Sequence, residues 1–306
     1  MTLVTLPGQD WVDAVGPVSG LELVPWDMAG APQRADEVRV VVPPYMGAGR
    51  VIHNLATVPG VELVQLLTAG YEEVQHVLPE GVALANAAGV HDASTAELAV
   101  ALMLASLRDF PDFFAAQQEQ RWLRGSIHGA LADRRVLVLG YGSIGRALAA
   151  RLAPFEVQLA AVASRARAGD DLVASVHGVD ELAELLPRHD VVVVIVPLGP
   201  ATRGMVDDAF LSAMPDGALL VNVARGGVVD TDALVRHLSA GRVRAALDVT
   251  EPEPLPAGHP LWSAPGVIVT PHVGGASTAF MPRAVRLLQE QLGAFAAGRP
   301  LRNVVT

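Results

Sequence analysis

The sequence contains no cysteine. A chain without cysteine forms no disulfide, no cysteine-ligated zinc site and no catalytic thiol. Aromatic residues make up only 5% of the 306 residues, and charged residues only 18%. Hydrophobic residues make up 51%, which is enough to bury sizeable cores, and the length suggests about two domains.

Positive charge is also scarce, because 22 Lys and Arg residues face 32 Asp and Glu residues. Nucleic acids and anionic membranes attract basic surfaces, so neither is expected as a partner, whereas a small anion needs only local positive charge. The longest apolar runs, at 98–107 and 191–197, are too short to span a bilayer. The first residues, MTLVTLPGQD, do not have the pattern of a signal peptide. We therefore predict a cytoplasmic protein.

Short apolar runs alternate with helical or polar segments along most of the chain. Continuously apolar strands suit parallel sheets that are covered on both faces, so the pattern predicts an α/β protein. Helices are expected near 48–57 and 71–77 in the first series of strands. The expected strands cover residues 38–43, 61–67, 82–87, 134–140, 157–163, 191–197, 217–224, 242–249 and 266–272.

A long helical passage separates the two series of strands. Ser94 and Glu97 have the spacing of a capping box, which predicts a helix that begins there and runs to about Leu107. A polar helix is expected to continue past Pro111 to about Trp122. The last segment, about 277–297, has helical spacing of apolar residues and can return to the first domain.

The stretch RRVLVLGYGSIGRALAARLA (134–153) reads as a strand, a glycine-rich turn and a helix. Gly140 permits the tight turn, Gly142 lets a pyrophosphate approach the backbone, and Gly145 lets the helix pack on the strand. The amides at the start of the helix supply an anion site. We therefore predict that a dinucleotide binds at Gly140, Tyr141, Gly142, Ser143, Ile144 and Gly145.

The end of the next strand, AVASRARAGDD, indicates which dinucleotide is bound. An acid that would accept the ribose 2′-hydroxyl of NAD is missing at the expected place, where Ser164, Arg165 and Arg167 stand instead. These residues predict a pocket for a 2′-phosphate, so NADP(H) is the preferred cofactor and NAD(H) the second choice. The alternative is a solvated basic turn. Asp170 and Asp171 come later than the expected acid.

Several motifs occur in one order along nearly the whole chain. They are AGY, NAAG, GYGSIG, PLGPATRGMV, NVARGGVVD, LDVTEPEP and TPHVGG. With them the chain resembles the D-isomer-specific 2-hydroxyacid dehydrogenases, which include glyoxylate/hydroxypyruvate reductases. The resemblance implies two doubly wound parallel-sheet domains. An NAD(P)-binding Rossmann domain (97–276) would be inserted in a discontinuous flavodoxin-like substrate domain (1–96 and 277–306). The resemblance also implies a homodimer that pairs through the cofactor domain.

Arg225 follows a buried strand, where a guanidinium is costly unless an anion meets it. A planar guanidinium fixes the plane of a carboxylate better than lysine does. The resemblance implies that Arg225 holds the carboxylate and carbonyl of a 2-oxo acid. The alternative is that Arg225 caps neighbouring carbonyls or pairs with Asp230.

His272 ends an apolar strand and precedes two glycines. An imidazole exchanges a proton near neutrality, so His272 is expected to donate the proton in the reduction. The resemblance implies that a glutamate five residues after Asp248, which is Glu253, assists this histidine. Glu251 is then expected to be solvated.

The resemblance also implies further contacts. Backbone amides of Ala69, Gly70 and Tyr71 would hold the substrate carboxylate, with Tyr45 and Met46 shaping the same pocket. Tyr71 has the alternative role of a packing aromatic. No metal is expected. The remaining residues implied in cofactor binding are Ser94, Pro197, Thr202, Asp248, Gly274 and His272 itself; for Ser94, Pro197 and Thr202 the alternative is a role as cap and turn residues.

Two other activities stay open at this point. One is a dehydrogenase of a phosphite-like anion, and the other is a non-catalytic scaffold that senses NAD(P). No long C-terminal extension is visible, so a regulatory amino-acid-binding domain is not expected.

Overall fold

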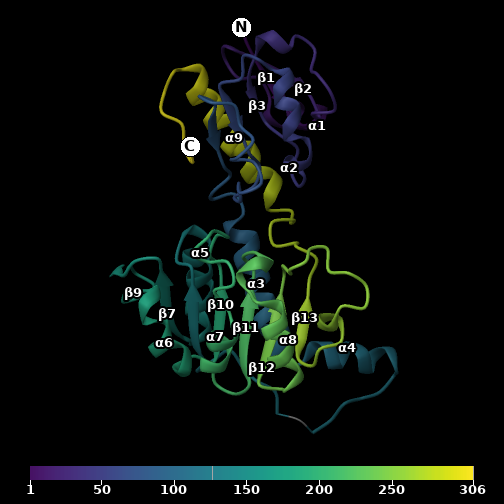
Figure 1. The fold of residues 1–306 in the computed structure, drawn as a ribbon, viewed down its shortest axis with the longest axis vertical. Helices are drawn as coiled ribbons and strands as arrows, with labels where there is room; N and C mark the ends of the chain where they lie inside the picture. The colour runs from purple at the N-terminus through teal and green to yellow at the C-terminus, as the bar shows by residue number, and fades with distance from the viewer. Residues whose placement is uncertain (126, 306) are drawn as a thin grey trace. The chain divides into compact units, whose positions relative to one another are not determined.

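A computed structural model of the chain describes residues 1–125 and 127–305. The chain divides into two compact units, Met1–His91 with Thr278–Thr306 and Asp92–Ser277 (Figure 1). The predicted boundary at 96/97 lies inside helix α3 (Asp92–Leu107), which begins at the first division, and the predicted boundary at 276/277 is one residue from the second division. Thr306, the end of the predicted substrate domain, lies outside the described residues.

The first unit is built on five parallel strands in the order β2-β1-β3-β4-β5. This is the strand order of flavodoxin-like folds. Helices α1 (Gln9–Val15) and α9 (Phe280–Ala296) contribute apolar side chains to the core on one face, and η2 (Ile52–Thr57) contributes to the core on the other. The strands are β1 (Thr2–Leu6), β2 (Leu21–Pro25), β3 (Val38–Val41), β4 (Leu63–Gln65) and β5 (Ala83–Ala85).

Three features of this unit differ from the sequence prediction. Strands β1 and β2 were not among the expected strands, although β1 is almost wholly buried. The expected helix at 48–57 is a single turn, α2 (Ala48–Val51), followed by η2. The helix expected at 71–77 is wrong. The amides of Val74 and Gln75 both donate to the Tyr71 carbonyl, and the amide of Val77 donates to the Val74 carbonyl, so the segment forms successive turns and not a continuous helix.

The second unit contains an eight-stranded sheet in the order β13-β12-β11-β10-β6-β7-β9-β8. Only β8 runs antiparallel to its neighbour, β9. The chain starts at β6 in the middle, winds outward through β7 and β9, and then returns to β10 on the other side of β6. This reversal is the switch point of a Rossmann fold, at which ligands bind beyond the carboxyl ends of the strands. The strands are β6 (Arg135–Leu139), β7 (Gln158–Ala163), β8 (Arg167–Ala168), β9 (Ser175–Gly178), β10 (Val191–Val194), β11 (Ala218–Asn222), β12 (Val243–Leu247) and β13 (Val267–Val269).

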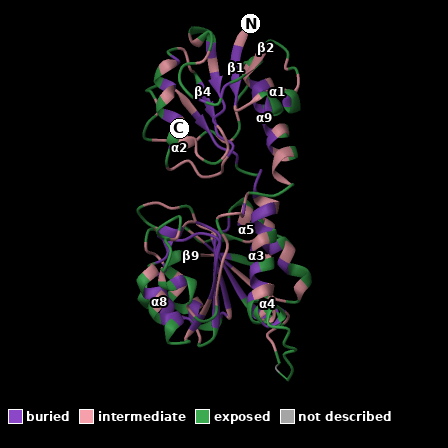
Figure 2. Cartoon of the chain, turned by 90° about the vertical axis from the view of Figure 1, so that its right-hand side faces the viewer, coloured by how far each residue is buried: buried purple, intermediate pink, exposed green. Residues whose placement is uncertain are grey.

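Two apolar layers cover this sheet. Helices α3 and α5 (Ser143–Leu152) pack on one face, whereas α7 (Asp208–Ala213) and α8 (Thr231–Ser239) pack on the other. Leu137 and Leu139 of β6 face the second layer, and Val136 and Val138 face the first, as the alternation of a strand requires. Figure 2 shows the buried strands between α8 on one side and α3 with α5 on the other.

The helical passage before β6 differs in detail from its prediction. The capping box is wrong, because Ser94 and Glu97 lie inside α3, and Glu97 forms an ion pair with Arg151 on α5 (3.1 Å). The polar helix α4 (Phe110–Gln118) ends before Trp122, and Pro111 lies in its first turn, where proline is tolerated. The expected last helix is confirmed as α9. No helix within 1–125 or 127–305 has the length and apolar character needed to cross a membrane.

Candidate active site

Three sequence motifs meet at one edge of the second sheet. Strand β11 pairs with β12, and β12 pairs with β13, all in parallel. Their carboxyl ends therefore lie together, and they are followed in turn by NVARGG, DVTEPEP and TPHVGG. This arrangement brings the loops that carry Arg225, Glu253 and His272 to the same edge.

His272 and Glu253 form a direct pair. Nδ1 of His272 donates a hydrogen bond to Oε1 of Glu253 over 2.5 Å, because the carboxylate is an acceptor only. A carboxylate on Nδ1 fixes the tautomer and leaves Nε2 as the nitrogen that can exchange a proton with a ligand. Glu251 is exposed and does not take this place; its main-chain carbonyl accepts a bond from the Thr231 hydroxyl.

The hydrogen bond between His272 and Glu253 shifts their two pKa values in opposite directions. The hydrogen bond from Glu253 raises the pKa of His272 above its usual value, against the opposing effect of burial. The same bond lowers the pKa of Glu253. The positive charge of Arg225 lowers both values, so this guanidinium acts electrostatically on each member of the pair. The three groups thus form one electrostatic unit.

Asp248 organises the turn that carries His272. Its side chain is 2% exposed, and the main-chain N–H of His272 donates to its carbonyl (2.8 Å). Its carboxylate accepts bonds from the Thr270 hydroxyl (2.6 Å) and from the amides of Val273 (2.9 Å) and Gly274 (2.8 Å). A buried carboxylate that is bonded in this way holds its surroundings rigidly. Its predicted contact with the cofactor stays a prediction.

The turn itself requires this support. His272 has a φ of 54°, in the left-handed region that non-glycine residues occupy at a cost. A side chain on Gly274 would place its Cβ only 2.9 Å from Oδ2 of Asp248, so glycine is needed there. The imidazole is therefore held by its backbone as well as by Glu253.

Arg225 is half-buried just after β11. Its Nη1 donates to the carbonyl of Ala224 (2.7 Å), which is the neighbour-capping contact considered as an alternative in the sequence analysis. Asn222, which is fully buried, donates to the Arg225 carbonyl (3.0 Å) and accepts from the Ala224 amide (3.0 Å). These bonds fix the backbone that presents the guanidinium. Asp230, the other proposed partner, caps helix α8 through the Ala233 amide.

Gly226 and Gly227 lack room for a side chain, each for a separate steric reason. A Cβ on Gly226 would overlap the main-chain carbonyl of Thr250. A Cβ on Gly227 would lie 2.9 Å from Oε2 of Glu251 and 3.0 Å from Nη1 of Arg203. The loop after β12 therefore runs directly against the loop after β11.

The glycine-rich turn after β6 has the geometry predicted from its sequence. Gly140 has a φ of 109°, and a Cβ there would lie 2.5 Å from the Ile195 carbonyl. A Cβ on Gly145 would overlap the Gly140 carbonyl, so close packing of α5 on the turn requires glycine. Gly142 has no atom within 4 Å of its Cβ position and stays open to an approaching ligand. Ser143 donates to Asp92 (3.1 Å), and Tyr141 is buried, while Ile144 is half-buried.

The basic segment after β7 separates into two kinds of residue. Ser164 and Arg165 are exposed, and neither is among the residues that line the pocket beside the glycine-rich turn. Arg167 lines that pocket, and its Nη2 donates to the main-chain carbonyl of Tyr141 (2.6 Å).

The other residues implied in cofactor binding have defined structural contacts. Ser94 is buried within α3 and is not a cap. Thr202 closes a turn, since its hydroxyl donates to the Pro197 carbonyl (2.6 Å) and accepts from the Gly199 amide (2.9 Å). Cofactor contacts for Ser94, Pro197 and Thr202 remain predictions.

The residues implied in substrate binding within the first unit lie on two loops. The carbonyl of Ala69 accepts a bond from Asn86 (2.8 Å), and that of Gly70 accepts one from Thr68 (2.8 Å). Tyr71 packs against the core beneath β4, which agrees with the packing alternative. Tyr45 stacks on Phe280 at 4.1 Å, whereas Met46 is exposed with a φ of 58°.

Two residues near these sites were not predicted from the sequence. Asn222 braces Arg225, and Arg146 lines the pocket beside the glycine-rich turn. An asparagine inside a buried strand is a signal that could have identified the first. No pattern in the sequence identifies the second. Among the described residues, no cluster of three or more His, Asp or Glu side chains could hold a metal ion.

Comparison with protein families identifies the second unit. The model of the D-isomer specific 2-hydroxyacid dehydrogenase, NAD binding domain, matches residues 100–274. A crystal structure of a D-isomer specific 2-hydroxyacid dehydrogenase from Xanthobacter autotrophicus Py2, in complex with NADPH and MES, superposes with a TM-score of 0.84. Its sequence is 33% identical, and the match covers 100% of this chain and 98% of that one.

Curated relatives of the chain include enzymes with two different activities. The human glyoxylate reductase/hydroxypyruvate reductase is 31% identical over 227 residues, which cover 71% of this chain and 68% of the relative. The D-3-phosphoglycerate dehydrogenase of Archaeoglobus fulgidus is 34% identical over 238 residues, which cover 76% of this chain and 44% of the relative. The chain thus spans about half the length of the phosphoglycerate dehydrogenases that it matches.

Proposed function

The chain belongs to the D-isomer-specific 2-hydroxyacid dehydrogenase family, and from this premise we propose that it reduces a small 2-oxo acid to the D-2-hydroxy acid. The observation that carries the proposal is the pairing of His272 with Glu253 at 2.5 Å, under the charge of Arg225. A cation for a carboxylate and a proton donor for a carbonyl oxygen are the two groups that this reduction requires.

Each side chain then has one role. Arg225 binds the substrate carboxylate and polarises the C2 carbonyl, which orients it for attack. His272 in its protonated form donates a proton to the carbonyl oxygen as charge develops there, and Glu253 stabilises the imidazolium. A reduced nicotinamide supplies the hydride to C2 when it is bound.

We propose NADPH as the preferred cofactor and NADH as the weaker one. The open Gly142 and the amides at the start of α5 suit the pyrophosphate. Arg167, which lines the pocket beside this turn, supports a 2′-phosphate over a free hydroxyl. A relative of the same fold was crystallised with NADPH, which agrees with this choice.

Residues of the first unit are also proposed to bind the substrate. The amides of Ala69, Gly70 and Tyr71 would donate to it, because bonds from Asn86 and Thr68 fix the carbonyls of this loop. Tyr45 and Met46 would limit the size of the substrate. The name of the human relative favours glyoxylate and hydroxypyruvate as substrates to examine first.

The test is a loss-of-absorbance assay of the purified chain with NADPH and NADH against glyoxylate, hydroxypyruvate, pyruvate and bulkier 2-oxo acids. Arg225→Ala should abolish turnover and leave NADPH binding within about twofold, since its contact is with the substrate. Arg236→Ala, on the exposed face of α8, is the matched control. Turnover that survives Arg225→Ala would refute the site. Cofactor binding without turnover on any 2-oxo acid would favour phosphite-like substrates or a sensing role.

We also propose a homodimer. Helix α4 and the segment after it expose Phe110, Phe114 and Trp122, the last of which is 85% exposed. Apolar side chains gathered on one surface are typical of an interface with another chain. Light scattering at micromolar concentration should give twice the chain mass, and a monomer would rule this out.

A further inference from the structure

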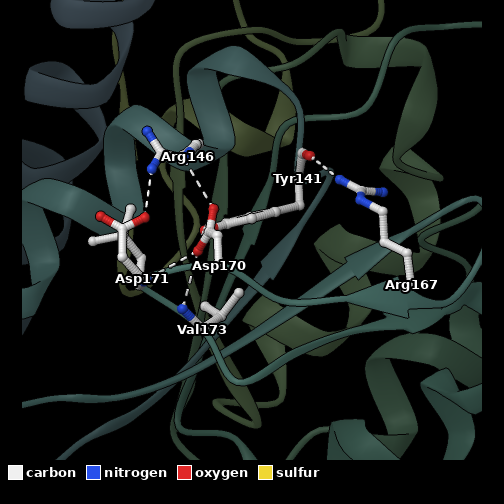
Figure 3. Close-up of polar contacts among 7 residues, drawn as sticks. Tyr141, Arg146, Arg167, Asp170, Asp171 and Val173 are labelled. Carbon is white, nitrogen blue, oxygen red and sulfur yellow. Dashed lines mark hydrogen bonds and ion pairs between the residues drawn. The ribbon is translucent and has the colours of Figure 1, made fainter.

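A second polar cluster lies beside the glycine-rich turn, outside the group around His272. It surrounds a pocket of about 270 Å³ between the start of α5 and strands β8 and β9. Figure 3 shows Arg146 and Arg167 near Tyr141, with Asp170 and Asp171 beside Arg146. The pocket is lined by Tyr141, Gly142, Ser143, Arg146, Arg167, Ala168, Gly169, Asp170 and Val176.

Arg167 is held in place without losing its capacity to bind. Nη2 donates to the Tyr141 carbonyl, so the guanidinium is tied to the glycine-rich turn itself. A guanidinium has five N–H donors. Its Nε and Nη1 atoms make no hydrogen bond to any residue within the described parts of the chain.

Arg146 reaches the pocket from helix α5. Its Nε donates to Oδ2 of Asp170 (2.9 Å), and its Nη2 donates to Oδ1 of Asp171 (2.5 Å). Nη1 makes no hydrogen bond to a described residue. Two aspartates thus fix the guanidinium of Arg146, and one terminal nitrogen keeps its donors.

Asp170 is a scaffold and not a ribose acceptor. Its carboxylate accepts from the Tyr141 hydroxyl (3.0 Å), from the Leu172 amide (2.9 Å) and, as Figure 3 also shows, from the Val173 amide and Arg146. These donors fill the roughly four acceptor positions of a carboxylate. The bonds, led by the one from the Leu172 amide, hold the pKa of Asp170 at about 2. Burial, with help from Asp170, raises the pKa of Tyr141 to about 12, so the phenol stays a donor.

The charges of the cluster favour an anion. The side chain of Asp171 is 72% exposed, so water and salt screen its charge. The charge of Asp170 is met by the hydrogen bonds just described. The pocket is therefore lined by two arginines and by one acid, Asp170, whose carboxylate is already hydrogen-bonded. It lies next to the turn that suits a pyrophosphate.

We propose that Arg146, on helix α5, is a further residue that selects NADP(H), because it binds the 2′-phosphate together with Arg167 while Asp170 positions its guanidinium. A phosphate dianion offers three acceptor oxygens, which suit the remaining donors of two guanidiniums. This role of Arg146 rests on the proposed use of NADP(H). Arg165 lies outside the pocket lining and contributes little to this selection.

The test uses binding, which does not depend on turnover. Isothermal titration of the full chain compares adenosine 2′,5′-bisphosphate with adenosine 5′-monophosphate, which differ only in the 2′-phosphate. Inorganic phosphate serves as a third probe. Arg146→Ala and Arg167→Ala should each raise the Kd of the bisphosphate by about tenfold or more, which is the usual effect of losing a hydrogen bond to a charged group. Each variant should leave the Kd of the monophosphate within about twofold of its original value.

Three further variants sharpen the result. Arg146→Lys should bind the bisphosphate more tightly than Arg146→Ala but less tightly than the original chain, because lysine keeps the charge but lacks the forked guanidinium. Asp171→Asn should lower the Kd of the bisphosphate slightly, because it removes a negative charge that pairs with Arg146. Arg151→Ala is the matched control, because Arg151 lies on the same helix and pairs with Glu97 away from the pocket.

The outcomes separate this inference from the proposed reduction. If Arg146→Ala changes the affinity for neither nucleotide, or lowers both affinities equally, Arg146 does not recognise the 2′-phosphate. If the unaltered chain binds the two nucleotides alike, or binds inorganic phosphate as well as the bisphosphate, the pocket is not a 2′-phosphate site. In either case a 2-oxo acid reductase that uses NADH would still stand. Loss of turnover with intact discrimination between the two nucleotides would refute the proposed reduction alone.

Discussion

The two halves of the second sheet stabilise their polar groups by different means. Beyond β11, β12 and β13, buried Asn222 and Asp248 bond mainly to backbone atoms and support Arg225 and His272. Beyond β6 and β7, the side chain of Arg146 is 54% exposed and is held by ion pairs with aspartates. Buried bonds to the backbone fix atoms closely, whereas exposed ion pairs leave charge accessible.

The difference matches what each half is proposed to do. Proton transfer requires an imidazole at a fixed distance from a carbonyl oxygen, and small displacements are costly. Selection between NADPH and NADH requires charge that an incoming phosphate can reach. The half with the buried supports should therefore be sensitive to substitution and insensitive to salt, and the other half should show the reverse.

Replacing His272 by alanine should have the largest effect. We expect turnover to fall by roughly 10²- to 10⁴-fold, the usual contribution of a positioned proton donor. The affinity for NADPH, followed by its fluorescence, should change little. His53→Ala, at an exposed position of η2, is the control. Residual turnover above one tenth would mean that another group donates the proton.

Replacing Asp248 by asparagine should destabilise the catalytic half. The side-chain NH2 of asparagine would face the backbone amide of either Val273 or Gly274, which would leave that donor unpaired. We expect a loss of about 1–3 kcal/mol in the free energy of unfolding, measured by urea denaturation. Asp232→Asn, exposed in the first turn of α8, should change it by less than about 0.5 kcal/mol. Equal effects would show that the buried network is not a special support.

Replacing Glu253 by glutamine should move the pH profile of reduction. Glu253 raises the pKa of His272, so protonated imidazole persists above the usual pH range, and activity is lost as pH rises through that pKa. Without the carboxylate, burial and Arg225 lower the pKa, and the alkaline limb should move to lower pH. At pH values above both limbs, each unit of movement costs about tenfold in the protonated fraction. An unmoved limb in kcat/KM between pH 5 and 9 would exclude the pair from the proton transfer.

A rise in salt concentration should have the smallest effect, and it should act on the half of the sheet beyond β6 and β7. Between 0.05 and 0.5 M NaCl the screening length shortens to a few ångströms, so exposed charges lose most of their influence. We expect the Kd of NADPH to rise by several-fold more than that of NADH, with kcat nearly unchanged. If kcat fell in parallel with NADPH affinity, the two halves would not differ as described.

Much of the second unit could be predicted from the sequence, for physical reasons. The long apolar strands and the glycine-rich turn of 134–153 are local signals, and the steric needs of Gly140 and Gly145 are those that the motif requires. Strands β8 and β9 are short and have few apolar residues, and they join the sheet only through pairing with β7 and with each other, so they were not expected.

The first unit and the supports of the site were harder to predict. In the segment 71–77, apolar spacing fits a helix, but the chain uses it to pack Tyr71 and Val74 against the core through turns. The pairing of Glu253 with His272 was expected from the motif pattern. The roles of Asn222 and Arg146 depend on contacts between loops that are distant in sequence, which a single sequence does not specify.

Any side chain at Gly226 would overlap the Thr250 carbonyl, so the two loops constrain each other's sequence. The ARGG and TEPEP segments are in direct backbone contact, so a side chain at Gly226 requires a different path for the segment at Thr250. A designer who grafts the loop that carries Arg225 into another scaffold should therefore transplant both segments. Natural variants at this position should be found only together with changes in the opposite loop.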